Sequence, residues 1–293
     1  MKIKRSRGEE IGHALILIFL ILLAFTTLYP FWHVLMYSLS DSGEAMKGGL
    51  FFIPRRTTLI AYRTVLKTRQ VFIAYRNTLL KTVLGTALSM VITALTAFPL
   101  SLKRLHGRKF FTFYIFFTML FSGGMIPTFL VVRDLGLVDT FWALILPGAM
   151  SAYNMFMLRN YFQQLPPELE ESAYIDGAAP PVALLFIILP VSLPCLAAIT
   201  MFYAMANWNN YLDCLLYTNS TELQVLQIYL RNLIASTGSM DTIATVGDGS
   251  AARLTEETVK MTSIAISIIP ILILYPFLQR FYTKGITVGA VKG

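Results

Sequence analysis

The segment Leu165–Pro181 has the residue spacing of a short, separate helix. Pro166 and Pro167 suit the entry of a helix, because proline is tolerated in the first turn, and the glutamates that follow complement the positive end of the helix dipole. Gly177 is placed for the left-handed residue that ends many helices. The spacing therefore predicts a helix over about 167–177 that stands apart from the apolar segments on either side.

This predicted helix has a surface suited to binding another protein. Leu169 and Ala173 are four residues apart and form an apolar strip, and a short helix with such a strip fits a groove on a partner. The alternative is an ordinary polar loop between two helices. The residues alone leave both interpretations open.

Other chemistry is poorly supported by residue types and spacing. The sequence has no G-x-x-x-x-G-K-[ST] loop to hold nucleotide phosphates and no G-x-S-x-G motif of a serine hydrolase. The three histidines are scattered, and Cys195 and Cys214 have no neighbouring cysteine or histidine at metal-ligand spacing. We therefore expect neither an enzyme nor a bound cofactor or metal in this chain.

The elements that position the short helix are long and apolar. Of the 293 residues 56% are hydrophobic and only 14% are charged, whereas soluble domains average about 25% charged residues. Because a helix of about 20 apolar residues crosses a bilayer, the sequence predicts an all-α membrane domain. Its six expected spans are about 11–37, 77–102, 110–132, 140–158, 182–205 and 258–281.

Basic residues predict the orientation of these spans. The N-terminus, the loop 103–109 and the tail after the sixth span are basic, which places both termini in the cytoplasm by the positive-inside rule. The first span is too long for a cleaved signal peptide and no A-x-A-like site follows it. Seven basic residues between 55 and 81 fall on the external side, and we expect Pro54–Ala74 to lie along the membrane surface. The net charge of +8 therefore indicates topology and lipid contact, and no nucleic acid partner is expected.

The segment 165–190 resembles the EAA loop of bacterial binding-protein-dependent ABC importers. That pattern is E-A-A, three residues, G, nine residues and I-x-L-P, and the sequence has Glu171-Ser172-Ala173, Gly177 and Ile187-x-Leu189-Pro190. Asp176-Gly177-Ala178 matches the D-G-A form common in sugar permeases, and Ser172 in place of the first alanine is the one departure. Further similarity covers Ile126-Pro127-Thr128, Leu135-Gly136-Leu137, Leu146-Pro147-Gly148 and the ending 281–293, and it is greatest to permeases for complex oligosaccharides and polysaccharide fragments.

The resemblance implies a single type I ABC importer transmembrane domain over residues 1–293, in the bacterial cytoplasmic membrane. It also implies a second homologous permease, two ATPase subunits that bind ATP and Mg, an external sugar-binding protein and an oligosaccharide substrate. Since no predicted span carries a charged residue near its middle for ion coupling, the energy must come from a partner. The expected ATPase-coupling residues are Glu170, Glu171, Ser172, Ala173, Asp176, Gly177 and Ala178.

Two further sets of residues are candidates for contact with the sugar and with its binding protein. The expected substrate path contains Ser89, Thr93, Asn154, Thr200, Tyr203, Asn207, Trp208 and Asn209, with hydrogen bonds between helices as the competing explanation. The expected binding-protein contacts are Gly238, Ser239, Asp241, Gly247, Asp248 and Gly249, in an irregular loop whose alternative is mere flexibility.

Two questions stay open at this point. An ion-coupled secondary carrier or a channel is the alternative to the ABC permease. The sugar is neutral or acidic, and few basic residues lie within the spans to decide between the two.

Overall fold

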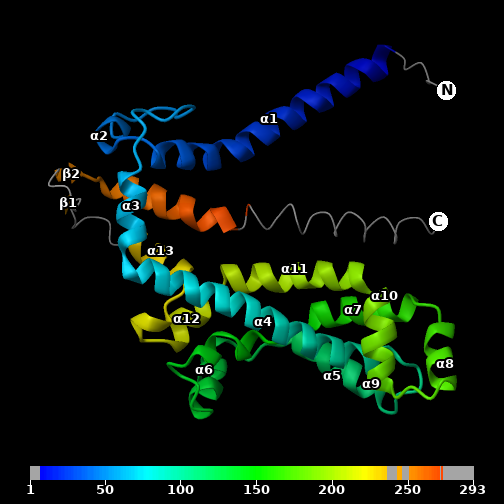
Figure 1. Cartoon of the computed structure of the whole chain (residues 1–293). Helices are drawn as coiled ribbons and strands as arrows, with labels where there is room; N and C mark the ends of the chain where they lie inside the picture. The colour runs from blue at the N-terminus through cyan, green and yellow to red at the C-terminus, as the bar shows by residue number, and fades with distance from the viewer. Residues whose placement is uncertain (1–6, 236–242, 246–250, 271, 273–293) are drawn as a thin grey trace. The chain divides into compact units, whose positions relative to one another are not determined.

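The computed structural model describes residues 7–235, 243–245, 251–270 and 272. The chain falls into two compact units, 1–68 with 232–269 and 69–231 with 270–293, which are described separately. Figure 1 labels the helices from α1 to α13 (Leu226–Ala235) and the short strands β1 and β2. The second unit contains the residues of the EAA-like segment.

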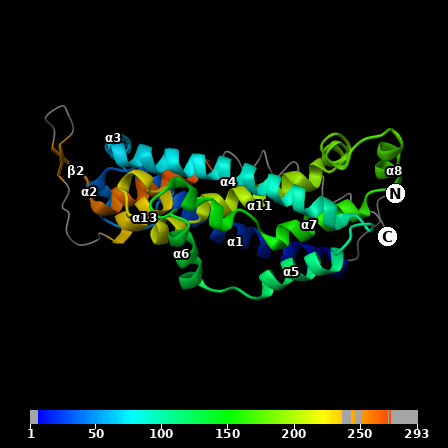
Figure 2. The ribbon, with the colours of Figure 1, turned by 90° about the horizontal axis from the view of Figure 1, so that it is seen from below.

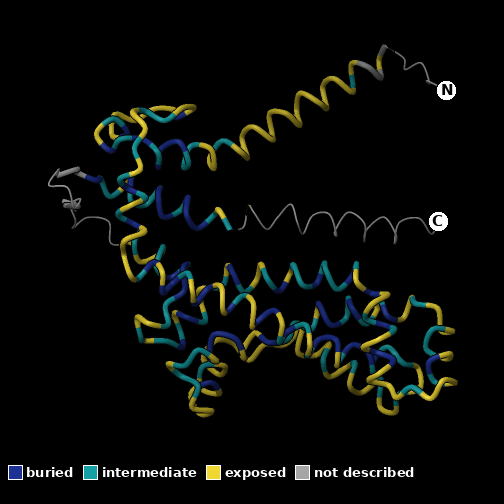
Figure 3. Tube along the Cα trace, in the orientation of Figure 1, coloured by how far each residue is buried: buried dark blue, intermediate teal, exposed yellow. Residues whose placement is uncertain are grey.

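The first unit begins with α1 (Arg7–Ser38), which contains a candidate membrane span over Ile11–Ser38. Its apolar side chains are largely exposed, as the yellow stretch in Figure 3 shows, which suits a lipid environment. The end of α1 packs against α2 (Ser42–Ala45) and its flanking loop, where Met36, Tyr37 and Phe51 are buried together.

The basic segment that was expected to lie on the membrane surface is divided between two helices. In α3 (Ile60–Lys67) Ala61 and Val65 are buried while Arg63 and Lys67 are exposed, so this part is amphipathic. Residues from Arg69 onward belong to α4 instead. The expectation of one surface segment over Pro54–Ala74 is therefore wrong for its last six residues, 69–74, which begin α4.

The rest of the first unit comes from the later part of the chain. Strands β1 (Ile243–Thr245) and β2 (Ala251–Arg253) pair antiparallel, with Ile243 opposite Arg253. The loop 238–250 was expected to be irregular, and β1 lies within it. Residues 256–270 are helical and cover the beginning of the sixth predicted span, whereas 271 and 273–281 lie outside the described residues.

Helix α4 (Arg69–Ser101) is the longest element of the second unit. Its 33 residues extend about 50 Å at 1.5 Å per residue, which exceeds the hydrocarbon core and begins eight residues before the predicted span. Figures 1 and 2 show α7 (Ala152–Gln164) and α11 (Leu193–Asn209) beside α4. Their shared core includes Ala97, Phe98, Met155, Leu158 and Ile199.

The predicted span 110–132 is divided into α5 (Arg108–Leu120) and α6 (Met125–Asp134), which meet at 116°. The break falls at Ser122-Gly123-Gly124. Gly124 has φ +90°, a value that side-chain-bearing residues rarely adopt, so this residue favours the turn.

Two more predicted spans are bent. The stretch 140–158 consists of the 3₁₀ turns η1 (Phe141–Leu144) and η2 (Leu146–Gly148), followed by α7 at 52°. The stretch 182–205 contains α9 (Pro180–Ala183), the π-helical η3 (Leu184–Ile188) and α10 (Leu189–Val191), and α11 follows at 88°. Proline removes a backbone donor and kinks helices, which accounts for the bends next to Pro147, Pro190 and Pro194.

Candidate coupling site and polar contacts between helices

Helix α8 (Glu168–Ile175) forms within the predicted range 167–177. It ends in a Schellman motif, in which the Ala178 amide donates to the Ala173 carbonyl at 2.9 Å and the Gly177 amide to the Tyr174 carbonyl at 3.1 Å. Gly177 adopts φ +79° with open space where a Cβ would lie, so its backbone conformation alone calls for glycine. Pro180 and Pro181 then begin α9.

The two faces of α8 differ from the sequence-based expectation. Ala173 is only 3% exposed and faces the chain's own residues, because α8 packs against α9 and η3. The prediction that Ala173 faces a partner together with Leu169 is therefore wrong for Ala173, whereas Leu169 is half-buried. The outer face carries Glu168, Glu171, Ser172 and Ile175, and the Ile175 side chain is 86% exposed.

Arg104, in the turn that follows α4, contacts α8 through both the positive charge and the flat face of its guanidinium group. Its guanidinium forms an ion pair with Glu170 at 3.1 Å and lies over the Tyr174 ring, 4.0 Å from the ring centroid. Burial raises the pKa of the Tyr174 hydroxyl, and the Glu170 carboxylate contributes in the same direction. Glu170, predicted as an ATPase contact, is therefore engaged within its own chain.

Sequence reasoning missed Arg104 because its partner lies 66 positions away. The available signal was the four-residue spacing of Glu170 and Tyr174, which places both side chains on one helix face. Among the other predicted coupling residues, Glu171, Ser172, Asp176 and Gly177 are exposed and Ala178 is half-buried.

Several candidates for the sugar path lie between helices. Thr93 and Tyr203 share a hydrogen bond of 2.6 Å between their hydroxyl groups, and the Ser151 amide donates to the Tyr203 hydroxyl at 3.0 Å. Ser89 and Asn154 are likewise buried. These positions fit the competing explanation, hydrogen bonding and packing between helices.

The remaining path candidates lie toward the end of α11. Thr200 and Asn207 are half-buried, Asn209 is exposed, and Trp208 is 4% exposed with no hydrogen-bond partner for its indole nitrogen in the part of the chain that the structure describes. The Asn207 side chain fits against Gly85, where a Cβ would come within 3.0 Å of it.

A buried charge lies near the start of the second predicted span. Lys81 is 1% exposed, donates to the Asn210 carbonyl at 3.1 Å and is 3.7 Å from Asp213. Asn210 also donates to the Asp213 carboxylate at 2.8 Å. Lys81 was grouped with the external basic residues between 55 and 81, because its partners, the Asn210 carbonyl and Asp213 of α12 (Leu212–Tyr217), lie more than 120 positions later.

The six predicted binding-protein contacts, Gly238, Ser239, Asp241, Gly247, Asp248 and Gly249, lie outside the described residues. Within the described ranges, no group of three or more His, Cys, Asp or Glu side chains is arranged to hold a metal ion.

The sequence profile of the binding-protein-dependent transport system inner membrane component family matches residues 71–288. The chain belongs to this family. A permease of this family is a multi-pass component of the inner membrane, and ATP binds a separate ATPase subunit of its ABC system. Membership confirms the expected all-α ABC importer fold and the non-catalytic transport role, and decides against an ion-coupled carrier or channel.

Individual relatives of this permease cover nearly its whole length. The polygalacturonan/rhamnogalacturonan transport system permease protein YtcP of Bacillus subtilis (strain 168) is 42% identical over 276 residues, 94% of this chain and 96% of that protein. The arabinooligosaccharides transport system permease protein AraQ of Halalkalibacterium halodurans is 29% identical, over 92% of this chain and 93% of that protein.

A solved structure has the same fold. It is a crystal structure of a bacterial ABC transporter involved in the import of the acidic polysaccharide alginate. The TM-score is 0.90 at 33% identity, with 96% of this chain and 100% of that chain covered.

Proposed function

We propose that this permease forms half of an oligosaccharide importer. The other half is a second homologous permease, with two ATPase subunits on the cytoplasmic face and a sugar-binding protein outside. The support is that relatives covering almost all of the chain are named for polygalacturonan and rhamnogalacturonan, for arabinooligosaccharides and for alginate. A panel of galacturonate and arabinose oligosaccharides, tested for uptake into proteoliposomes that contain the whole transporter, distinguishes acidic from neutral substrates.

The proposed coupling element is α8, and the single observation that carries it is the arrangement of its two faces. The inner face is fastened by Ala173 and Arg104, whereas the outer face presents Glu171, Ser172 and the 86% exposed Ile175. An apolar side chain so exposed outside the spans fits insertion into a groove of the ATPase. Closure of the ATPase dimer then moves α8, and the rigid-body movement exchanges inward-facing and outward-facing states.

The coupling proposal fixes the topology. If α8 faces the ATPase, the side of the membrane that carries α8 is the cytoplasm. Six crossings, with the sixth over about 258–281, then place both termini in the cytoplasm as well. Labelling of a cysteine introduced near residue 4 by a membrane-impermeant reagent, in sealed cells and after permeabilisation, tests this orientation.

The proposed sugar contacts follow from exposure within the second unit. Thr200, Asn207 and Asn209 have accessible side chains on α11, and amide and hydroxyl groups can hydrogen-bond to sugar hydroxyls. The loop with Gly238, Ser239, Asp241, Gly247, Asp248 and Gly249 is the proposed binding-protein contact. Photocrosslinkers placed at Ser239 and Asp248 should label the binding protein when its oligosaccharide is present.

The substitution that tests coupling is Ile175→Asp in the complete transporter. We expect the ATPase subunits to lose most of their stimulation by binding protein and oligosaccharide, because a carboxylate enters an apolar groove. Leu135→Asp, which also changes an exposed apolar side chain outside the spans but away from α8, is the control. Unchanged stimulation in Ile175→Asp would refute the role of α8.

A further inference from the structure

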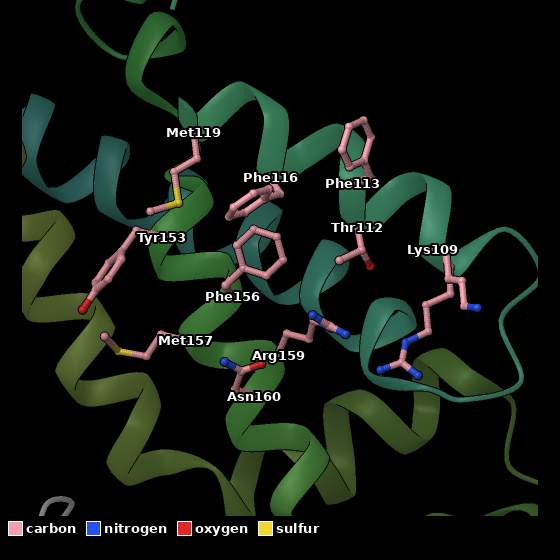
Figure 4. A pocket seen from close by; sticks show the side chains of 11 residues that line it. Lys109, Thr112, Phe113, Phe116, Met119, Tyr153, Phe156, Met157, Arg159 and Asn160 are labelled. Carbon is pink, nitrogen blue, oxygen red and sulfur yellow. The ribbon is translucent and has the colours of Figure 1, made fainter. Parts of the chain in front are cut away.

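A cavity of about 840 Å³ lies between α5 and α7, within the unit 69–231 (Figure 4). One part of its lining is cationic and the other is apolar. The cationic part consists of Arg108, Lys109 and Arg159, and the apolar part of Phe113, Phe116, Met119, Phe156 and Met157. The lining residues include no acidic side chain. The cavity therefore has a positively charged end and an apolar body.

A backbone carbonyl and a side-chain amide hold the two guanidinium groups of the cavity close together. Arg108 and Arg159 both donate through Nε to the Leu100 carbonyl, each at 3.0 Å. The Gln163 side-chain oxygen, in the amide orientation that satisfies its neighbours, accepts from Nη2 of Arg159 at 3.3 Å and from Nη2 of Arg108. Two guanidinium groups held together without a carboxylate repel each other, and a bound anion would relieve this repulsion.

The apolar part continues directly from the charged end. Arg159 lies over the Phe156 ring at 5.8 Å, and Phe156 meets Phe116 edge to face with centroids 6.4 Å apart. Phe113 is 65% exposed and Met119 is 49% exposed. Among the residues of α5, none is buried, so this helix presents an open apolar surface beside the cavity.

The dimensions match one leaflet of a bilayer. From Arg108 to Met119 α5 rises about 17 Å at 1.5 Å per residue. Half of a hydrocarbon core is about 15 Å thick. A ligand with its charge at Arg108 would therefore extend its apolar part along the cavity to about the middle of the membrane.

We propose that this cavity binds an anionic phospholipid from the leaflet on the α8 side. Its phosphate is held by Arg108, Lys109 and Arg159, with Asn160 beside them, and an acyl chain lies along Phe113, Phe116 and Phe156. Basic pockets between membrane helices bind headgroups of this kind. This site is independent of the coupling proposal, because it involves neither the outer face of α8 nor the ATPase.

The test measures lipid retained by the complete transporter. Native mass spectrometry of the complex, purified from membranes and titrated with phosphatidylglycerol, should show at least one tightly retained lipid. Lys109→Gln should lower its occupancy several-fold, and Lys109→Gln with Arg159→Gln should abolish it. Lys109 suits the single variant because it has no hydrogen-bond partner within the described residues, so its replacement leaves the fold intact.

The matched control is Lys103→Gln, which removes an exposed positive charge from the neighbouring loop without touching the cavity. It should retain phosphatidylglycerol like the wild type, and phosphatidylcholine should not compete. Equal retention in Lys109→Gln and wild type would overturn the proposal. So would displacement of the lipid by an acidic oligosaccharide, or efficient crosslinking of Phe113→Cys to the second permease, because each identifies a different occupant.

Discussion

Arg104 and Tyr174 stack with the guanidinium carbon 4.0 Å from the ring centroid, and the same guanidinium binds Glu170 at 3.1 Å. One side chain therefore joins the turn after α4 to two successive positions on one face of α8. Arginine suits this place because its plane stacks on an aromatic ring while its edge binds a carboxylate. The contact ties the proposed coupling helix to the longest helix of its unit.

Replacement of Arg104 should reduce the coupling of ATP hydrolysis to transport more strongly than it reduces thermal stability. The ion pair and the cation–π contact are partly exposed and contribute about 1 kcal/mol together, so Arg104→Ala should lower the melting temperature by only a few degrees. Substrate-stimulated ATPase activity in proteoliposomes should fall several-fold, because α8 loses its link to α4. Lys103→Ala is the control, and equal activities of the two variants would contradict this role.

Gly177→Val should destabilise the end of α8 through backbone strain alone. The residue has φ +79°, and the left-handed conformation costs a side-chain-bearing residue about 1–2 kcal/mol. Gly177→Asn should cost less, because asparagine tolerates this conformation. The melting temperatures of the two purified variant transporters measure this difference. A melting temperature for Gly177→Val equal to that of Gly177→Asn would argue against the strain.

Removal of one partner from the Lys81–Asp213 pair should be costly. A buried ion pair that loses one member leaves an uncompensated charge, at about 3–5 kcal/mol. Lys81→Met and Asp213→Asn should therefore each lower the melting temperature strongly. The double variant should recover part of the loss, and strictly additive losses in this double-mutant cycle would show that the two residues do not interact.

Tyr203→Phe separates packing from sugar contact. The change removes the bond to Thr93 and leaves the Ser151 amide without its acceptor, which costs about 1–3 kcal/mol. We expect lower thermal stability with an unchanged KM for the oligosaccharide. Asn209→Ala, at an exposed position, should raise KM and leave stability unchanged. A raised KM with unchanged stability in Tyr203→Phe would instead indicate that Tyr203 contacts the sugar.

Local patterns in the sequence predicted the parts of the structure that depend on neighbouring residues. The run of apolar residues in α1 and the Pro-Pro and Gly-x-x-Pro punctuation around α8 act within a few positions, so helix locations followed from them. Which face of α8 is buried depends on η3, and the environment of Lys81 depends on Asp213. Such contacts join distant segments and leave little trace in local spacing.

The bends in the predicted spans depend partly on local residues and partly on distant contacts. The break at Ser122-Gly123-Gly124 has a local cause, because glycine accepts the positive φ that Gly124 adopts. The angles of 116° and 88° are set by what the two halves pack against, and a string of apolar residues carries no information about direction. The sequence predicts these segments as single spans, whereas three of them are bent in the structure.

The fastening of α8 has a mechanical consequence. Ala173 is packed against the chain and Arg104 binds Glu170 on the same inner face, while the amides of Gly177 and Ala178 close the end of the helix, so α8 is held rigidly. Packed protein interiors are stiff and transmit displacement. A displacement of Ile175 by the ATPase should therefore move α4 and η3 by nearly the same distance, because α8 moves as a rigid body.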